Sequence, residues 1–469
     1  MTTLAVKILP GPKTTPVLGS LPNLIRFFRQ PIALMREHRH LYGKLSGLIA
    51  PVHNGQKGQI LAIGGEYNQL VLSDPKRFYA RNSRVPENTA AERISTGIVY
   101  LNGERHRQQR GLMLPAFHRK AIDAYAQHML AVTDLFLRNW REGQQINVID
   151  EMTKLTMNVV LRTLFGIEDL QEGYKLGALL EEWLKYAGSL PVNLFPYNLP
   201  GTPVRRLVTV SEQIEQQTQR ILAEKRVNLE QHTDIVSGLM RAHDEDGARL
   251  SDTEVIGNAV LLFLAGHETS ANALTWTLYL LAQHPEIFQD VMDELEGLLH
   301  GAMPNVEHLN QMPLLEGVIH ESLRLMPPLG FNYKKAVEPF EMGGYEFSAG
   351  TDVLLSHFMS HREPDIFPDP EVFKPHRWLN LNVGTYDYIA FNGGPRLCLG
   401  ATFAMVEMKL VLATLLQRFR LACIPNSSVE VTTLFLLRAK HVPMVIHKQD
   451  RKFERVPVGG NIHELILPS

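Results

Sequence analysis

The sequence predicts a mainly α-helical protein with a small β region (α+β), folded as one domain over residues 1–469. Apolar residues recur three and four positions apart over about 102–325 and 398–420, the spacing of helices that bury one face. Short apolar runs broken by glycine occupy about 1–100, 330–390 and 425–450, as strands do. No internal repeat, low-complexity tract or linker divides the chain.

The composition is that of a globular protein with ample material for a large core, since 45% of residues are hydrophobic and 20% are charged. A net charge of -2 gives no sign of a nucleic-acid partner. Two cysteines cannot form a disulfide framework, and no apolar run approaches the ~20 residues of a membrane span. We therefore expect a soluble, cytoplasmic protein with no transmembrane segment and no secretory signal.

Three short stretches predict the strands of the β region. Residues 48–63 (LIAPVHNGQKGQILAI) place Asn54, Gly55 and Gly58 between two apolar runs, which predicts a β-hairpin. Residues 337–356 contain short strand-like runs with glycines, and residues 431–446 (VTTLFLLRAKHVPMVI) predict paired strands near the C-terminus.

The helical part contains one helix of more than 30 residues, predicted to run from Ser251 to about His284. It begins with Ser-Asp-Thr-Glu, a capping box, and ends before a proline. Its apolar flanks indicate that it is buried on nearly all sides.

The middle of this helix reads AGHETS and is unusually polar. Gly266 weakens the helix, and the Thr269 hydroxyl can bond to the carbonyl of Ala265, four residues earlier. Glu268 beside an alcohol in an apolar helix is costly unless it is solvated or used. A polar patch that faces a neighbouring helix is the alternative.

The second polar motif is a cysteine loop, FNGGPRLCLG, at residues 391–400. A helical pattern follows it, so the sulfur of Cys398 lies near a helix N-terminus, where the dipole and free N–H groups favour a thiolate. Glycines at 393, 394 and 400 let the loop turn tightly. A small buried hydrophobe is the alternative role of this cysteine.

The spacing of Phe391, Gly394, Arg396, Cys398 and Gly400 reproduces Phe-x-x-Gly-x-Arg-x-Cys-x-Gly and resembles the haem-binding loop of the cytochrome P450 family. The resemblance implies the fold of that family, with haem b (iron protoporphyrin IX) between the long helix and the helix after the cysteine loop. It also implies that the Cys398 thiolate is the axial iron ligand and that Phe391, Arg396 and Gly400 contact the haem.

The polar centre of the long helix resembles the Ala-Gly-x-Glu-Thr motif of the same family. On that reading Ala265 and Gly266 leave room for dioxygen and substrate above the iron. Thr269 would hydrogen-bond the dioxygen, and Glu268 would feed protons to it.

A further motif, Glu-x-x-Arg, is formed by Glu321 and Arg324, which share a helix face and can pair. Apolar neighbours indicate a buried pair, and such a pair needs further partners. The resemblance supplies one, Arg377 of the Pro-x-Arg segment FKPHRW. These three residues are expected to hold the fold and to take no catalytic part.

Haem carries two carboxylates, so its pocket must offer cations or hydrogen-bond donors. Arg396 is the first candidate. His106 and Arg110 match the family's Trp/His-x-x-x-Arg spacing, and Lys334 stands where family members often carry arginine. A surface position is the alternative for His106.

The resemblance implies separate electron donors, because no Gly-x-Gly-x-x-Gly follows a strand. We expect a ferredoxin or flavodoxin-type donor with its reductase. An acidic donor would dock on basic residues near the cysteine. These residues are Arg105, Arg107, Arg110, Arg396 and Lys409.

The stretches that contact substrate in the family are mostly apolar here, which suits a hydrophobic small molecule such as a fatty acid, terpenoid or polyketide-like compound. Ile98, Phe331 and Phe435 are predicted to touch it. The proline-rich stretch within 186–203 is either an access lid or a weak membrane-surface contact.

Together these motifs predict a monooxygenase that inserts one oxygen atom of dioxygen into a C–H or C=C bond. Two rivals remain: a haem-thiolate peroxygenase or isomerase, and a non-catalytic haem protein that senses gas or carries electrons. Glu268 and Thr269 disfavour both rivals, since neither activity needs a proton relay.

Overall fold

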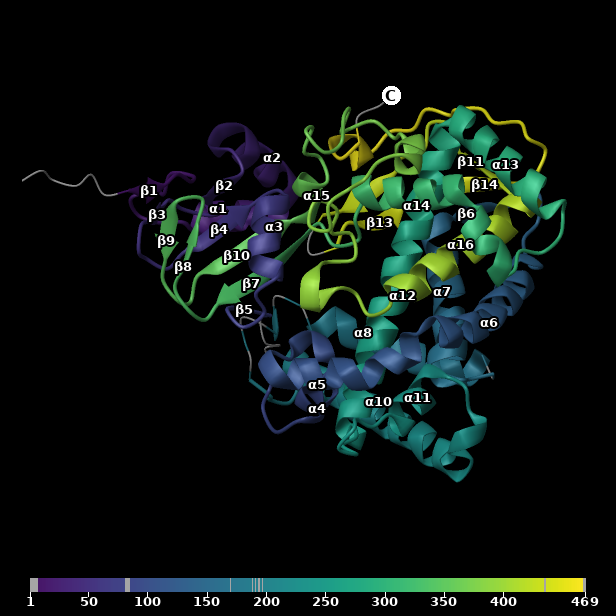
Figure 1. Cartoon of the computed structure of the whole chain (residues 1–469), viewed down its shortest axis with the longest axis horizontal. Helices are drawn as coiled ribbons and strands as arrows, with labels where there is room; N and C mark the ends of the chain where they lie inside the picture. Colours follow the sequence, from purple (N-terminus) through teal and green to yellow (C-terminus); the bar gives the residue numbers. More distant parts are fainter. Residues whose placement is uncertain are drawn as a thin grey trace, which may run out of the picture.

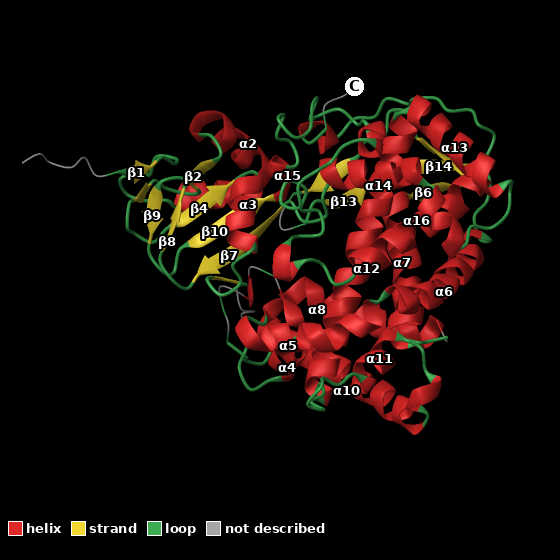
Figure 2. Ribbon diagram, viewed as in Figure 1, coloured by secondary structure: helices red, strands yellow, loops and turns green. Residues whose placement is uncertain are grey.

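The computed structural model describes residues 7–80, 85–168, 170–187, 189, 191–192, 195, 197–433 and 436–466. Figure 1 shows a β-rich part, with the first three helices, beside a larger helical body. Figure 2 shows that the helical body also carries a few short strands. The prediction of a mainly α-helical protein with a small β region is confirmed.

The β-rich part is built around a five-stranded sheet in the order β2-β4-β10-β7-β5. β4 and β10 are parallel, and the other neighbours are antiparallel. Two small antiparallel pairs, β1 with β3 and β8 with β9, complete this part. Its elements are β1 (Ile8–Leu9), α1 (Leu21–Arg29), α2 (Pro31–Tyr42), β2 (Leu45–Gly47), β3 (Val52–His53), β4 (Gln59–Ala62), α3 (Gly65–Leu72), β5 (Phe78–Tyr79), β7 (Phe331–Ala336), β8 (Phe340–Met342), β9 (Tyr345–Phe347) and β10 (Asp352–Ser356).

The predicted hairpin within 48–63 is wrong in its first arm. β3 pairs with β1, not with β4, and β4 pairs instead with β2, so that Leu45 lies opposite Ala62. The turn residues do separate two strands, but distant segments decide which strands pair. β10, almost 300 residues later, occupies the other edge of β4.

The helical body covers the predicted helical ranges, whereas α4 and α15 lie in ranges predicted for the β region. It consists of α4 (Ala90–Ile94), α5 (Gly103–Met113), α6 (Arg119–Leu137), α7 (Val148–Phe165), α8 (Leu170–Ala187), α10 (Pro203–Val227), α11 (Ile235–Arg241), α12 (Asp252–Gln283), α13 (Pro285–Leu299), α14 (Pro313–Leu325), α15 (His357–Ser360) and α16 (Ala401–Arg418). Short 3₁₀ turns link these helices: η1 (Ile98–Tyr100), η2 (Leu114–Phe117), η3 (Leu229–Gln231), η4 (Val306–Gln311), η5 (Pro375–Leu379), η6 (Gly394–Arg396) and η7 (Asn461–Glu464). Within the described ranges, no helix has the length and apolar character that crossing a membrane requires.

Two small sheets lie on the helical body. One has the order β11 (Phe419–Cys423), β14 (Pro443–Lys448) and β6 (Gln145–Asn147), and the other pairs β12 (Glu430–Thr432) with β13 (Arg438–His441). The predicted C-terminal strands are therefore present, although residues 434–435 lie outside the described ranges.

The long helix α12 has the predicted ends. The Ser251 hydroxyl accepts a hydrogen bond from the Glu254 N–H, and the Glu254 carboxylate accepts one from the Ser251 N–H, so the capping box is formed. The helix packs against α7 and α14 and ends at Gln283, before Pro285.

α12 links two hydrophobic cores. Its first half, up to Phe263, belongs to a core with α6, α7 and α10. Its last turns, from Ala271, belong to a second core with α13, α14 and α16. The polar AGHETS stretch lies between the two, which places it where the helix packs least completely against other side chains.

Candidate functional site

The centre of α12 presents a small-residue face that neighbouring side chains leave uncovered. Ala265 is exposed in the middle of this long helix, and Gly266 and Thr269 are half-buried. The Thr269 hydroxyl donates to the Ala265 carbonyl at 2.5 Å, as the sequence predicts. An alcohol and two small residues thus present accessible atoms in the middle of this helix.

Glu268 lies next to this face and is largely buried. Its carboxylate forms an ion pair with the Arg438 guanidinium, with 3.3 Å between Oε1 and Nη1. Burial raises the pKa of Glu268, the charge of Arg438 lowers it, and the charge of Glu181 on α8 raises it further. An acid with a raised pKa beside an alcohol can hold and pass a proton.

The cysteine loop is shaped by its glycines. Gly394 has φ +59°, and a Cβ there would come within 2.5 Å of the Leu72 carbonyl oxygen, so a larger residue does not fit. The Cys398 N–H donates to the Phe391 carbonyl at 2.8 Å, which closes the loop. As predicted, Cys398 lies just before a helix, since α16 begins at Ala401.

The Cys398 residue is exposed to solvent, although protein atoms also pack around its sulfur. This surrounding protein raises the pKa of the thiol, although the Gly400 N–H and the Arg110 charge both lower it. A thiol in such a place becomes a thiolate when it ligates a metal cation. The sulfur is therefore suited to bind an iron.

Four basic side chains from three segments come together beside the cysteine loop: His106 and Arg110 on α5, Lys334 on β7 and Arg396 on η6. Burial, followed by the charges of the other three, lowers the pKa of His106 to about 4. Burial and the charge of Arg396 lower the pKa of Lys334 to about 8. Burial and the charge of Arg110 lower the pKa of Arg396 to about 10.

Arg396 has an unsatisfied donor within this cluster. Its Nη2 donates to the Leu101 carbonyl at 2.6 Å and to the Asn102 Oδ1 at 2.8 Å, but its buried Nε has no hydrogen-bond partner among the described residues. Mutual repulsion of the cations and an unpaired buried N–H both favour an anionic partner. The carboxylates of a haem fit this demand, so the cluster suits the predicted cofactor.

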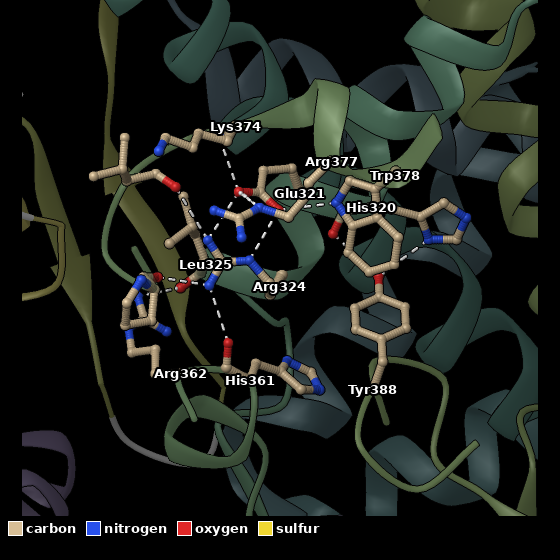
Figure 3. Close-up of polar contacts among 12 residues, drawn as sticks. His320, Glu321, Arg324, Leu325, His361, Arg362, Lys374, Arg377, Trp378 and Tyr388 are labelled. Atoms are coloured by element: carbon tan, nitrogen blue, oxygen red, sulfur yellow. Dashed lines mark hydrogen bonds and ion pairs between the residues drawn. The ribbon is translucent and has the colours of Figure 1, made fainter. Parts of the chain in front are cut away.

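The predicted Glu-x-x-Arg motif forms a buried network, shown in Figure 3. Each oxygen of the Glu321 carboxylate accepts a hydrogen bond of 2.8 Å from a nitrogen of Arg324. They also accept the Arg377 Nε at 3.2 Å, the Trp378 Nε1 at 2.9 Å and the backbone N–H of Lys374 at 2.9 Å. The sequence predicted Arg377 but missed Trp378, although it stands in the same quoted segment, FKPHRW.

Arg324 is as fully satisfied as its acid partner. Its remaining N–H groups donate to the carbonyls of His361 at 3.0 Å, Pro370 at 2.6 Å and Val372 at 3.2 Å. Neither side chain is exposed to solvent. A buried ion pair stabilises a fold only when its other hydrogen bonds are made, and here they are.

A second buried acid lies on the other side of α12. The Ser270 hydroxyl donates to the Glu407 Oε2 at 2.7 Å, and the Glu407 Oε1 has no hydrogen-bond partner within the described structure. Burial raises the pKa of Glu407 to about 8. Sequence reasoning missed this pair because its members are 137 positions apart.

The residues predicted to contact substrate lie in different parts of the fold. Ile98 is buried in the same core as Phe263 of α12, near the small-residue face. Phe331 lies on β7, with its ring centre 5.4 Å from that of Phe27 and 5.9 Å from that of Tyr333. Phe435 lies outside the described residues. Contact of these residues with substrate stays a prediction.

The predicted basic docking face is wrong for Lys409. That side chain is buried and donates to the Leu309 carbonyl at 2.8 Å and to Glu316. Arg105 and Arg107 do lie on the surface of the protein. The remaining two basic residues, Arg110 and Arg396, belong to the cluster beside the cysteine.

Comparison with known proteins agrees with this geometry. The sequence model of the family described as "Cytochrome P450" matches residues 9–444. Cyclooctat-9-en-7-ol 5-monooxygenase of Streptomyces melanosporofaciens is 30% identical over 93% of this chain and 94% of its own length. Pentalenene oxygenase of Streptomyces avermitilis is 28% identical over 89% of this chain and 94% of its own. The solved structure of retinoic acid-bound cyanobacterial CYP120A1 has a TM-score of 0.79 at 24% identity, over 95% of this chain and 100% of that one.

Proposed function

Since the chain belongs to the cytochrome P450 family of haem-iron monooxygenases, we propose that it oxidises a hydrophobic terpenoid by hydroxylation or epoxidation, with Cys398 as the axial ligand of haem b. The observation that carries the cofactor site is the meeting of His106, Arg110, Lys334 and Arg396 beside the cysteine loop, with the buried Arg396 Nε unpaired. These groups would hold the two haem carboxylates.

When bound, haem supplies an iron that activates dioxygen with two electrons from redox partners. The Cys398 thiolate would hold the iron and supply it with electron density. Phe391 and Gly400 would border the haem on the cysteine side. The residues of α12 would act on the opposite side.

Residues of α12 would transfer the protons that the reaction needs. Ala265 and Gly266 keep the space beside the helix free for dioxygen and substrate. The Thr269 hydroxyl now donates to a backbone carbonyl, and a rotation about its χ1 angle would let it donate into that space instead. Glu268, whose pKa is raised by burial, would resupply the proton.

The substrate class is supported by the two relatives named above, whose names give cyclooctat-9-en-7-ol and pentalenene as what they act on. It is also supported by the apolar character of Ile98 and Phe331, which are predicted to line the site. Such a surface suits an apolar carbon skeleton. A fatty acid or a polyketide-like compound is the alternative.

Electrons would come from a ferredoxin or flavodoxin-type donor with its reductase. The exposed side chains of Arg105 and Arg107 support docking of an acidic partner near α5. A chain with two free cysteines fits the reducing cytoplasm, which is where we propose that it works.

Two experiments test the proposal. Terpenoids and fatty acids are screened for a shift of the ferric haem absorption band, and we expect terpenoids to give the larger shifts. Turnover of a hit with dioxygen and a surrogate ferredoxin is then compared with turnover by peroxide alone. Product from peroxide but not from dioxygen would favour a peroxygenase, and a carbon monoxide spectrum typical of imidazole ligation would overturn the cysteine assignment.

A further inference from the structure

One face of α12 is fastened to the start of β13 by three contacts, each one helical turn from the next. The contacts join Glu268 to Arg438, Asn272 to Ala439, and Trp276 to Leu437. The Ala439 N–H donates to the Asn272 Oδ1 at 2.8 Å, and the Trp276 Nε1 donates to the Leu437 carbonyl at 3.3 Å. The Asn272 amide also donates to the Glu268 carbonyl at 2.8 Å. β13 is thus held in one register against the acid of the proposed relay.

The ion pair in this row joins the interior to the surface. The Glu268 side chain is 10% exposed and the Arg438 side chain is 48% exposed. Arg438 therefore reaches the buried carboxylate while half of its own side chain meets solvent. Among the described residues that contact Glu268, Arg438 is the one that both pairs with the buried carboxylate and keeps half of its side chain in solvent.

Titratable groups on three elements lie near Glu268, and two of them are charged at neutral pH. Arg438 approaches from β13 and favours the ionised carboxylate, whereas Glu181 approaches from α8 and disfavours it. His267, the preceding residue on α12, is neutral at physiological pH, because burial lowers its pKa to about 4. Arg438 is consequently the cation that opposes burial and Glu181 at this acid.

We propose that Arg438 is a positioning residue that holds the Glu268 carboxylate at the solvent-facing side of α12, so that protons for Thr269 enter through this pair. The role of those protons rests on the proposed monooxygenase function; the ion pair itself does not. The three contacts fix the distance between the strand and the helix, so the guanidinium stays within reach of the acid.

The two charged neighbours of Glu268 predict shifts of opposite sign. Replacing Arg438 by glutamine removes the opposing cation, so burial and Glu181 raise the pKa of Glu268 further. Replacing Glu181 by glutamine removes a like charge and lowers that pKa. If Arg438 merely supported the strand, its replacement would leave the titration of Glu268 unchanged.

The test titrates the Glu268 carboxyl in the ferric haem-loaded protein by infrared difference spectroscopy, with the band assigned by Glu268→Gln. We expect Arg438→Gln to shift the titration upward, Glu181→Gln to shift it downward, and Arg438→Lys to restore the wild-type value. Lys440→Gln is the matched control: it removes a cation from the same strand whose Nζ lies 3.0 Å from the Glu430 Oε2. It should leave the titration unchanged.

Dioxygen consumption gives a second readout, with a surrogate ferredoxin and its reductase as electron source and no added substrate. Its pH profile should shift with Arg438→Gln by the same amount as the infrared titration. An unshifted titration in Arg438→Gln, with the thiolate-type carbon monoxide spectrum intact, overturns this inference and leaves the proposed function standing. Loss of that spectrum in the wild type overturns the proposed function instead. If Arg438→Gln does not fold, Arg438→Met decides, because it also removes the charge of the ion pair while keeping a long side chain.

Discussion

Replacing Glu407 by glutamine should stabilise the protein at neutral pH more than at pH 5. The Glu407 carboxyl is fully buried, accepts one hydrogen bond from Ser270, and leaves its second oxygen without a partner among the described residues. Burial raises its pKa to about 8 in the folded protein. In the unfolded chain the same group has a pKa of about 4.3.

The difference between these two values sets the direction and size of the effect. Between pH ~4.3 and pH ~8 the folded state keeps a proton on Glu407 that the unfolded state releases, so the free energy of unfolding falls as pH rises. The slope is ~1.4 kcal/mol per pH unit, or about 3 kcal/mol from pH 5 to pH 7. Glutamine does not titrate, and its amide oxygen can still accept the Ser270 hydroxyl. From pH 5 to pH 7, the free energy of unfolding of the variant should therefore rise by about 3 kcal/mol relative to that of the wild type.

The assay is urea unfolding of the haem-loaded protein, followed by tryptophan fluorescence at pH 5, 6, 7 and 8. Taking the difference between variant and wild type at each pH cancels the other titrating groups. Ser270→Ala is the control, because it deletes the hydrogen bond at 2.7 Å but keeps the acid, so its stability should retain the wild-type pH slope. A Glu407→Gln difference that does not change between pH 5 and pH 7 would refute the buried, protonated state of this carboxyl.

Three further predictions concern the site and its support. Arg377→Ala removes a guanidinium from the buried acid of Figure 3 and should cost about 3 kcal/mol and weaken haem retention, measured by thermal melting and by the ratio of haem to protein absorbance. Lys374 contacts that acid through its backbone and not its side chain, so Lys374→Ala should cost much less stability. Equal losses of stability in the two variants would contradict the network. Cys398→Ser should abolish the thiolate-type spectrum of the reduced carbon monoxide complex, and its persistence would exclude this ligand. Thr269→Ala should produce more hydrogen peroxide and less product per dioxygen consumed. Thr275→Ala loses the same type of bond, at 2.7 Å, on a buried part of the same helix and should stay coupled.

Features with a local cause were predictable from the sequence. The ends of α12 follow from a capping box and a proline, which act within a few residues. The cysteine loop follows in part from Gly394, whose positive φ and close approach to the Leu72 carbonyl favour glycine. The order of motifs along the chain then indicated the family and, with it, the placing of Arg377.

Features that depend on distant partners were not predictable in this way. The partner of β4 was misassigned because β2 takes one of its edges and the distant β10 takes the other, while β3 pairs with β1. Lys409 looks like a surface cation in the sequence, yet Glu316 on another helix covers it. Arg438 carries no local signal at all, since its partner lies 170 positions earlier on α12.

The position of α12 between two hydrophobic cores has a consequence for how such a protein diversifies. One half of the helix is anchored near Phe263 and the other beyond Ala271, so the turns between them contribute little to the folding energy. Substitutions at the exposed Ala265 can then reshape the surface beside the helix at small thermodynamic penalty. Laboratory evolution toward new substrates should accordingly accumulate changes there first, before it reaches the cores on either side.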